Sequence, residues 1–117
     1  MKRDMDLVRK ILFAMEDGPA LAPDNLDLAG YDDETVSYHL AIMGEAGLLL
    51  VLDDSSLSEI GAIPVRLTWA GHEFLESVRE DSRWNDVKAQ MNKAGGFVFE
   101  VAKASATSWM LRQLGLS

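Results

Sequence analysis

The sequence contains no cysteine, which excludes disulfide bonds and thiolate metal sites. It also lacks a long apolar run, because the longest, AGLLLVL at residues 46–52, is far shorter than the roughly 20 residues that span a bilayer. The N-terminus, MKRDMDLVRK, mixes both charge signs and is not followed by an apolar stretch of signal-peptide type. We therefore expect a cytoplasmic protein with no membrane segment.

Basic residues are missing from a long part of the chain. Residues 11–65 carry eleven acidic side chains and no Lys or Arg, while residues 1–10 carry four basic side chains and two acidic ones. The net charge of the whole chain is −8, so the acidic excess arises in that one segment. Where these acidic residues lie limits what the protein can bind more than the net charge does.

Length and composition are those of a globular domain. A chain of 117 residues, 48% of them hydrophobic and 26% charged, is long enough to bury roughly two thirds of its unfolded surface around one core. Apolar residues at three- and four-residue intervals predict helices. The predicted helices cover residues 4–16, 32–47, 69–80, 82–95 and 97–114. The first two have carboxylates at their starts, and Thr68 and Ser82 are the predicted N-caps of the next two. The prediction is thus a mostly helical chain.

Two strands with a polar loop between them follow the second predicted helix. Residues 48–52 are apolar throughout, residues 53–62 form a mainly polar loop, and Val65, Leu67 and Trp69 alternate as in a returning strand. We predict an α+β fold, mostly helical: a winged helix-turn-helix with a two- or three-stranded wing sheet and extra C-terminal helices. Residues 1–81 would form the winged helix, and residues 82–117 a helical extension packed on the same core.

Two motifs carry a resemblance to known proteins. The stretch VSYHLAIMGEAGL, followed by PVRLTWAGHEFL, resembles winged-helix regulators, in which a helix ends in E-A-G-L and the wing ends in L-T-x-x-G. Three blocks, MKRDMDLVRKIL, GYDDETVSYHLAIMGEAGLL and IPVRLTWAGHEFLESVREDSRWNDVK, are similar to the family called domain of unknown function 2513. That resemblance implies a winged-helix-like fold, a phage or prophage connection and a bacterial host cell, with no established activity.

DNA binding is one of two hypotheses for the helix at 32–47. It offers Ser37, Tyr38 and His39 as contacts to bases or backbone, and no arginine. The residues available to hold phosphates are Lys2, Arg3, Arg9, Lys10 and Arg66. Two unit charges about 10 Å apart in water repel by about 0.4 kcal/mol, so several carboxylates facing phosphates oppose most of the free energy of non-specific binding. DNA binding is therefore the alternative.

Protein binding is the leading hypothesis. An acidic segment, defined here by Asp24, Asp27, Asp32, Asp33 and Glu34, would face a basic surface of a nucleic-acid-handling protein, as its inhibitor or regulator. The competing interpretation of the same residues is a solvated face that keeps the protein soluble.

Enzyme chemistry has little support. The string HEFLE places His72 and Glu76 on one helix face, but no third metal ligand is evident. No nucleophile elbow, phosphate-binding glycine loop or dinucleotide fingerprint occurs. We expect no catalytic residue, no metal and no cofactor.

The three tryptophans have two predicted roles. Trp69 and Trp84 fall on apolar stripes and are predicted to lie in the core. Trp109, Met110 and Leu114 belong to the last predicted helix and are less clearly used by one core. We predict a homodimer formed through that helix.

Overall fold

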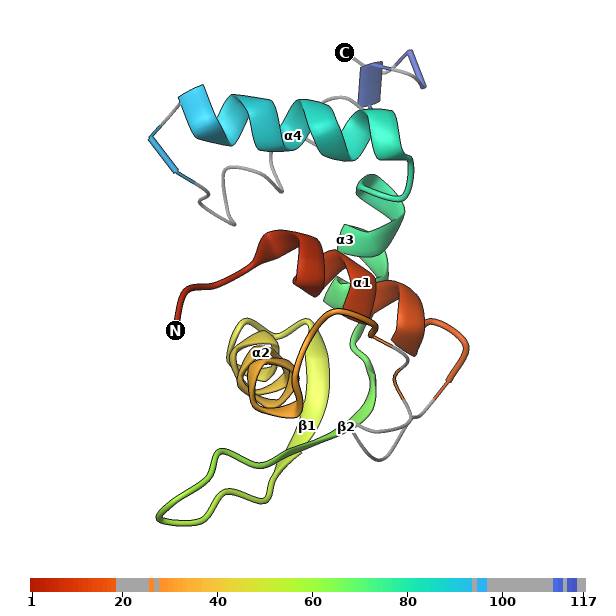
Figure 1. Cartoon of the computed structure of the whole chain (residues 1–117). Coiled ribbons are helices and arrows are strands. Elements are labelled where there is room, and N and C mark those ends of the chain that lie inside the picture. Colours follow the sequence, from red (N-terminus) through yellow and green to blue (C-terminus); the bar gives the residue numbers. More distant parts are fainter. Residues whose placement is uncertain (19–25, 27, 94, 97–110, 113, 116–117) are drawn as a thin grey trace. The chain divides into compact units, whose positions relative to one another are not determined.

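The computed structural model describes residues 1–18, 26, 28–93, 95–96, 111–112 and 114–115. The chain divides into two compact units, Met1–Glu73 and Phe74–Ser117, each described by itself below. Within the described residues the elements run α1 (Met5–Met15), α2 (Asp33–Glu45), β1 (Leu49–Asp53), β2 (Ala62–Leu67), α3 (Trp69–Ser77) and α4 (Asp81–Lys93) (Figure 1). The predicted α+β class, mostly helical, is confirmed.

Helix α1 begins at a carboxylate and buries one apolar stripe. Asp4 is the N-cap, and its Oδ1 accepts the backbone N–H groups of Asp6 at 3.0 Å and Leu7 at 3.2 Å. This satisfies two of the N–H groups that a helix start leaves without an intrahelical partner. The buried side chains, spaced three and four residues apart, are Leu7, Val8, Ile11, Leu12 and Met15.

Helix α2 is built in the same way. Asp32 is its N-cap and accepts the Thr35 backbone N–H at 2.7 Å. Its buried residues are Val36, His39, Leu40 and Met43. The helix ends at Gly47, whose positive φ of 80° is a conformation that glycine adopts without strain. The Leu48 N–H then bonds to the Met43 carbonyl at 3.0 Å, and the chain turns directly into β1.

The two strands form an antiparallel hairpin. Leu49 pairs with Leu67 and Asp53 with Ala62, with an irregularity between Leu50 and Val51. The Asp54 N–H bonds to the Gly61 carbonyl at 2.9 Å, which closes the connecting loop. The sheet has two strands in the described part of the chain. The second strand begins three residues earlier than predicted and ends at Leu67.

Thr68 joins the end of α2 to the start of α3. Its Oγ1 donates to the Gly47 carbonyl and accepts the Gly71 backbone N–H at 3.0 Å, which makes it the predicted N-cap of α3. Its own N–H bonds to the Leu48 carbonyl at 3.1 Å. A Cβ on Gly71 would overlap that same carbonyl oxygen. The E-A-G-L and L-T-x-x-G motifs are thus two sides of one contact.

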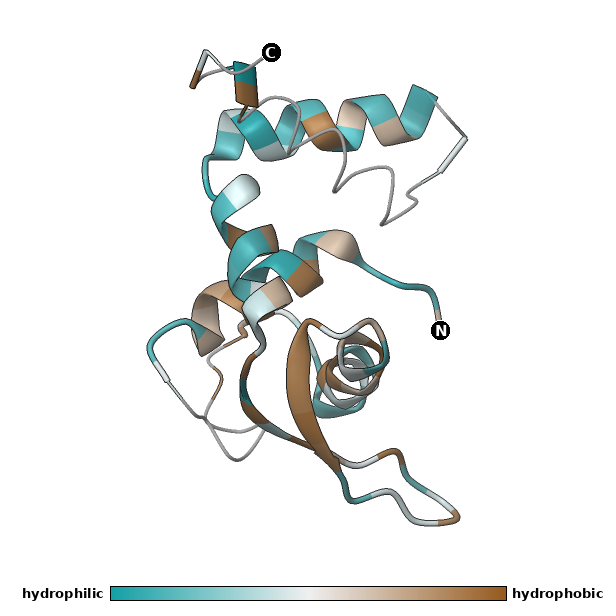
Figure 2. Ribbon diagram, turned by 180° about the vertical axis from the view of Figure 1, so that it is seen from behind, coloured by the Kyte–Doolittle hydropathy of each residue, from teal (hydrophilic) through white to brown (hydrophobic). Residues whose placement is uncertain are grey.

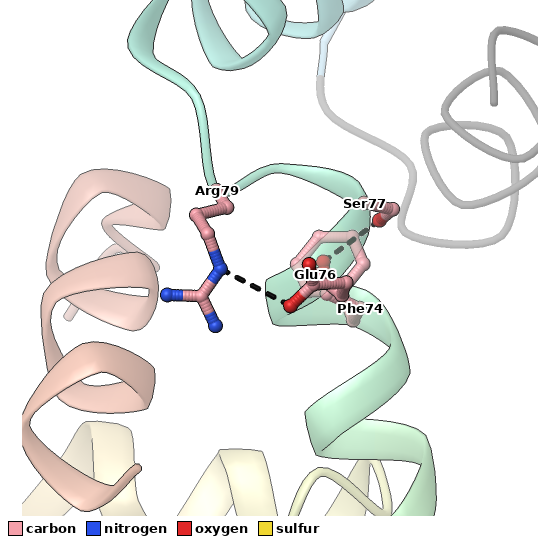
Figure 3. Close-up of polar contacts among 4 residues, drawn as sticks. All are labelled: Phe74, Glu76, Ser77 and Arg79. Atoms are coloured by element: carbon pink, nitrogen blue, oxygen red, sulfur yellow. Dashed lines mark hydrogen bonds and ion pairs between the residues drawn. The ribbon is translucent and has the colours of Figure 1, made fainter. Parts of the chain in front are cut away.

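The second unit contains the end of α3 and all of α4. Near the end of α3, Ser77 Oγ donates to the Phe74 carbonyl at 2.7 Å, and Arg79 Nε donates to Glu76 Oε2 at 3.1 Å (Figure 3). Helix α4 begins at Asp81, so Ser82 lies in its first turn and not at the predicted N-cap. Trp84, Val87 and Met91 form the buried stripe of α4.

Of the two tryptophans predicted to lie in the core, one is buried and one is exposed. Trp84 is buried, as predicted. The prediction that Trp69 belongs to the core is wrong, because its side chain is 80% exposed and its Nε1 donates to Glu73 Oε1 at 2.7 Å. Trp69 opens α3 instead of ending β2, so its side chain does not follow the alternation of the strand. Trp109 lies outside the described residues.

Candidate functional site

The outer face of α2 and the hairpin beside it form the most distinctive surface of the first unit. Asp32, Asp33 and Glu34 are exposed at the start of the helix, and Glu45 is exposed at its end. Ser37 and Tyr38 lie half-buried between these ends. The two hollows on this surface are named here the loop hollow and the strand groove.

The loop hollow lies between the first turns of α2 and the hairpin loop, and it has a volume of about 770 Å³. Helix α2 contributes Asp33, Glu34, Ser37 and Tyr38 to its lining, and the loop contributes residues 55–60. The strand groove, of about 580 Å³, lies between the outer face of α2 and β1. The two hollows share Tyr38, Ser55 and Ile60 in their linings, so the surface is continuous from the start of α2 to its end.

Apolar side chains are exposed along the hairpin. Leu50 is 42% exposed, Leu52 56% and Ile60 48%, and all three line the strand groove. Leu57 is fully exposed in the loop. Figure 2 shows β1 in hydrophobic colours with α2 beside it. Exposed apolar side chains gathered around one hollow are typical of an interaction surface, whereas isolated ones are common on any protein.

The charged side chains that line the two hollows are all of one sign. Five carboxylates line the two hollows, and no Lys or Arg does so among the described residues. They are Asp33, Glu34, Glu45, Asp53 and Glu59. Hydrogen bonds from the Ser55 side chain and backbone hold the pKa of Asp53 below its ordinary value. Those from Thr35 lower the pKa of Asp32 in the same way, so both groups stay charged well below neutral pH.

His39 is not part of this surface. Its ring is fully buried; Nε2 lies 2.8 Å from the Asp4 backbone nitrogen, and Nδ1 lies 2.8 Å from the Thr35 carbonyl oxygen. Because the Asp4 N–H is a donor, Nε2 is the acceptor, and the neutral ring carries its proton on Nδ1. The prediction that His39 contacts DNA therefore needs correction, since both ring nitrogens are used inside the fold.

The same network includes Tyr31. Its hydroxyl donates to Asp4 Oδ2 at 3.3 Å. Burial raises the pKa of Tyr31, and the negative charge of Asp4 adds to this shift, so the hydroxyl keeps its proton. Asp4, Tyr31 and His39 thus hold the start of α1 against α2.

The basic residues predicted to hold phosphates lie on other elements. Lys2, Arg3, Lys10 and Arg66 are exposed. The Lys10 ammonium lies 5.3 Å from the centre of the Tyr31 ring, and the Arg9 guanidinium lies 4.9 Å from that of Phe13. None of these five basic residues lines either hollow.

His72 and Glu76 are the two residues that the sequence offered as metal ligands, and no metal site was expected there. Glu76 forms an ion pair with Arg79 at 3.1 Å. Across the described ranges, no group of three or more His, Asp or Glu side chains is placed to hold a metal ion. Nothing in this part of the chain adds a third ligand to the pair.

Several predicted residues fall elsewhere. Asp24 and Asp27 of the acidic segment, and Trp109 and Met110 of the self-association surface, lie outside the described residues. Leu114 is described and is 68% exposed. Among the described helices, none has the length and apolar character needed to cross a bilayer.

Sequence reasoning missed Leu50, Leu52 and Ile60 as site residues. A signal was present, because LLVL is apolar at every position. A strand with one solvated face alternates apolar and polar residues, so an unbroken apolar strand indicates that both of its faces have apolar neighbours. In the described structure Leu50 and Leu52 remain exposed.

Comparison with known proteins agrees with the resemblance seen in the sequence. The model of a family described as hypothetical protein, domain of unknown function 2513, matches residues 2–97. An uncharacterized protein of Haemophilus influenzae is 45% identical over 92 residues, which cover 75% of this chain and 76% of that protein. No solved structure matches the chain. The chain therefore belongs to the family of domain of unknown function 2513.

Proposed function

We propose that the first unit is a winged helix without catalytic activity that binds a protein partner through an acidic surface, defined as the loop hollow and the strand groove together. The observation that carries the proposal is the lining of the loop hollow and the strand groove: five carboxylates, exposed apolar side chains and no Lys or Arg among the described residues. Because nucleic-acid-handling proteins present basic surfaces that complement these carboxylates, the proposed partner is such a protein, inhibited or regulated by this chain.

The winged-helix assignment is supported by the order of the elements. Helix α2 turns directly into β1, the hairpin projects beside it, and β2 leads through Thr68 into α3. In that architecture α2 takes the place of the recognition helix and the 54–61 loop that of the wing. The function must still be argued from the surface, because winged helices bind partners of several kinds.

The electrostatics of α2 favour a protein over DNA. A recognition helix normally neutralises phosphates with Lys and Arg, and this one presents Asp33, Glu34 and Glu45. Of the three side chains predicted to contact DNA, His39 is buried, and Ser37 and Tyr38 lie half-buried in the hollows. The basic residues of α1 and β2 remain as the basis of the alternative, a DNA-binding transcriptional regulator.

The mixture of apolar and charged groups indicates the chemistry of the partner. Leu50, Leu52 and Ile60 offer apolar area that a partner would remove from water. The surrounding carboxylates would speed and orient the encounter with a cationic surface. The partner surface that fits is therefore basic and partly apolar.

A selection from a random displayed peptide library would test the proposal. The immobilised full chain is expected to enrich peptides that combine Lys or Arg with apolar residues. Glu45→Lys should weaken the selected peptides about fivefold, because reversing one charge about 8 Å from a partner charge in water changes the energy by about 1 kcal/mol. Lys at this position also suits the C-terminal end of α2, so the fold should tolerate the change.

The matched control is Asp17→Lys, which makes the same charge change at an exposed residue that lines neither hollow. It should leave the affinity within about twofold. Enrichment of acidic peptides, or an equal loss in both variants, would contradict binding through the acidic surface.

A further inference from the structure

The strand groove follows the edge of β1. Its lining includes all five consecutive residues of the strand, Leu49–Asp53. Successive side chains of a strand point to opposite faces, so a groove over one face would be lined by alternate residues. Consecutive lining means that the groove is open to the main chain along this edge.

That edge has no partner strand in the described part of the chain. The sheet there consists of β1 and β2 alone, and all the described pairings of β1 are to β2. An open strand edge presents a row of N–H and C=O groups that can pair with another chain. Proteins often protect such edges with charged side chains or cover them, whereas β1 carries Leu50 and Leu52, both exposed.

The opposite side of the groove is formed by α2. Tyr38, Ala41 and Ile42 give it an apolar wall, and Glu45 stands at its end. At Gly44, α2 packs directly against β1, since a Cβ on Gly44 would overlap Cγ2 of Val51. An occupant of the groove would therefore have β1 on one side and an apolar helix face on the other.

The charge of the groove distinguishes two possible occupants, a second copy of this chain and a basic segment of another protein. A second copy of this chain pairing through β1 would bring two acidic grooves together, each lined by Glu45 and Asp53 and by no Lys or Arg among the described residues, and like charges close to each other across strands are destabilising. A basic segment would instead meet Glu45 and Asp53 within the groove. The occupant is thus a cationic segment of another protein.

We propose that the strand groove binds an extended segment of the partner, in which Lys or Arg alternates with apolar residues, and that this segment adds to β1 as a further strand. Main-chain hydrogen bonds to β1 give affinity, and the alternating side chains meet the apolar and acidic parts of the groove. Five residues at about 3.3 Å each span roughly 17 Å, the length of β1. The inference rests on the proposed function and specifies its partner.

The test uses a fluorescein-labelled heptapeptide that alternates lysine and valine, titrated with the full chain and followed by fluorescence anisotropy at low salt. A second peptide has the same sequence with every backbone nitrogen methylated, which removes the N–H donors and keeps the charges and side chains. We expect the first peptide to bind at least about tenfold more tightly than the second. A third peptide, with glutamate in place of lysine, should not bind.

Protein variants locate the site. Leu52→Arg replaces an exposed apolar side chain of the groove with a positive charge and should weaken the first peptide about tenfold. Ala14→Arg adds the same charge on an exposed position of α1 that does not line the groove, and it should change affinity less than about twofold. Circular dichroism of both variants checks that the fold is kept.

The outcomes separate this inference from the proposed function. Equal binding of the methylated and unmethylated peptides would overturn strand addition and leave binding through the acidic surface standing. Failure of all three peptides to bind would overturn the inference as well, and the library selection would then decide the proposed function by itself. Equal effects of Leu52→Arg and Ala14→Arg would place the peptide outside the groove.

Discussion

Replacing His39 tests the network that joins α1 to α2. His39→Ala removes a fully buried ring whose Nε2 accepts the Asp4 N–H at 2.8 Å. Truncating a buried side chain of this size costs about 2 kcal/mol through lost packing and the remaining cavity. Leaving the Asp4 N–H without its acceptor adds about 1 kcal/mol, the lower end of the usual range, since this bond is only partly buried. We expect a loss of about 3 kcal/mol in the free energy of unfolding.

Urea denaturation followed by circular dichroism measures this loss as a lower transition midpoint. His39→Phe separates the two contributions, because it fills the site with a slightly larger aromatic ring and removes both hydrogen bonds. It should cost about 1 to 2 kcal/mol. The control is His72→Ala, at the other histidine of the chain, which is exposed on α3 and should cost less than about 0.5 kcal/mol. If His39→Ala cost no more than His72→Ala, the network would not stabilise the fold.

Three further predictions follow from the same structure. Gly71→Ala should lower the stability by about 1 to 3 kcal/mol in thermal melts, because the new Cβ would overlap the Leu48 carbonyl, and an unchanged melt would show that this contact is not tight. The lowered pKa values of Asp32 and Asp53 give stability that is present above the ordinary carboxylate pKa of about 4 and is lost as the pH falls through the lower folded values. The double variant Asp32→Asn with Asp53→Asn should therefore flatten the acid limb of a stability profile, and an identical limb would contradict the assigned cause. Trp69→Phe should lower the iodide quenching of tryptophan fluorescence at a cost below about 0.5 kcal/mol, and unchanged quenching would show that Trp69 is buried in solution.

The helix starts could be predicted from the sequence because their signals are local. Apolar periodicity predicted both α1 and α2, with carboxylates at their starts, and the structure shows Asp4 and Asp32 as their N-caps. Thr68 was likewise identified as the cap of α3. Such signals depend only on neighbours in the chain, and the fold did not override them.

Positions set by contacts distant in sequence were not predicted. Trp69 fits the alternation of a strand, yet the Thr68 cap begins a helix there and turns its ring outward. His39 looked like a surface residue, because a polar side chain on a helix carries no sign of its partner 35 residues away in the chain. The sequence also drew attention to the carboxylates and away from Leu50 and Leu52, whose exposure depends on which side of β1 is covered.

The proposed function requires that the face of α2 binds a protein and not DNA. Fluorescence anisotropy of a labelled random DNA duplex, titrated with the full chain from low to high salt, tests it most directly. We expect no binding even at low salt, because the carboxylates of α2 and the hairpin repel phosphates. Binding that weakens steeply as salt rises would show phosphate contacts, contradict the proposed function and support the DNA-binding regulator instead.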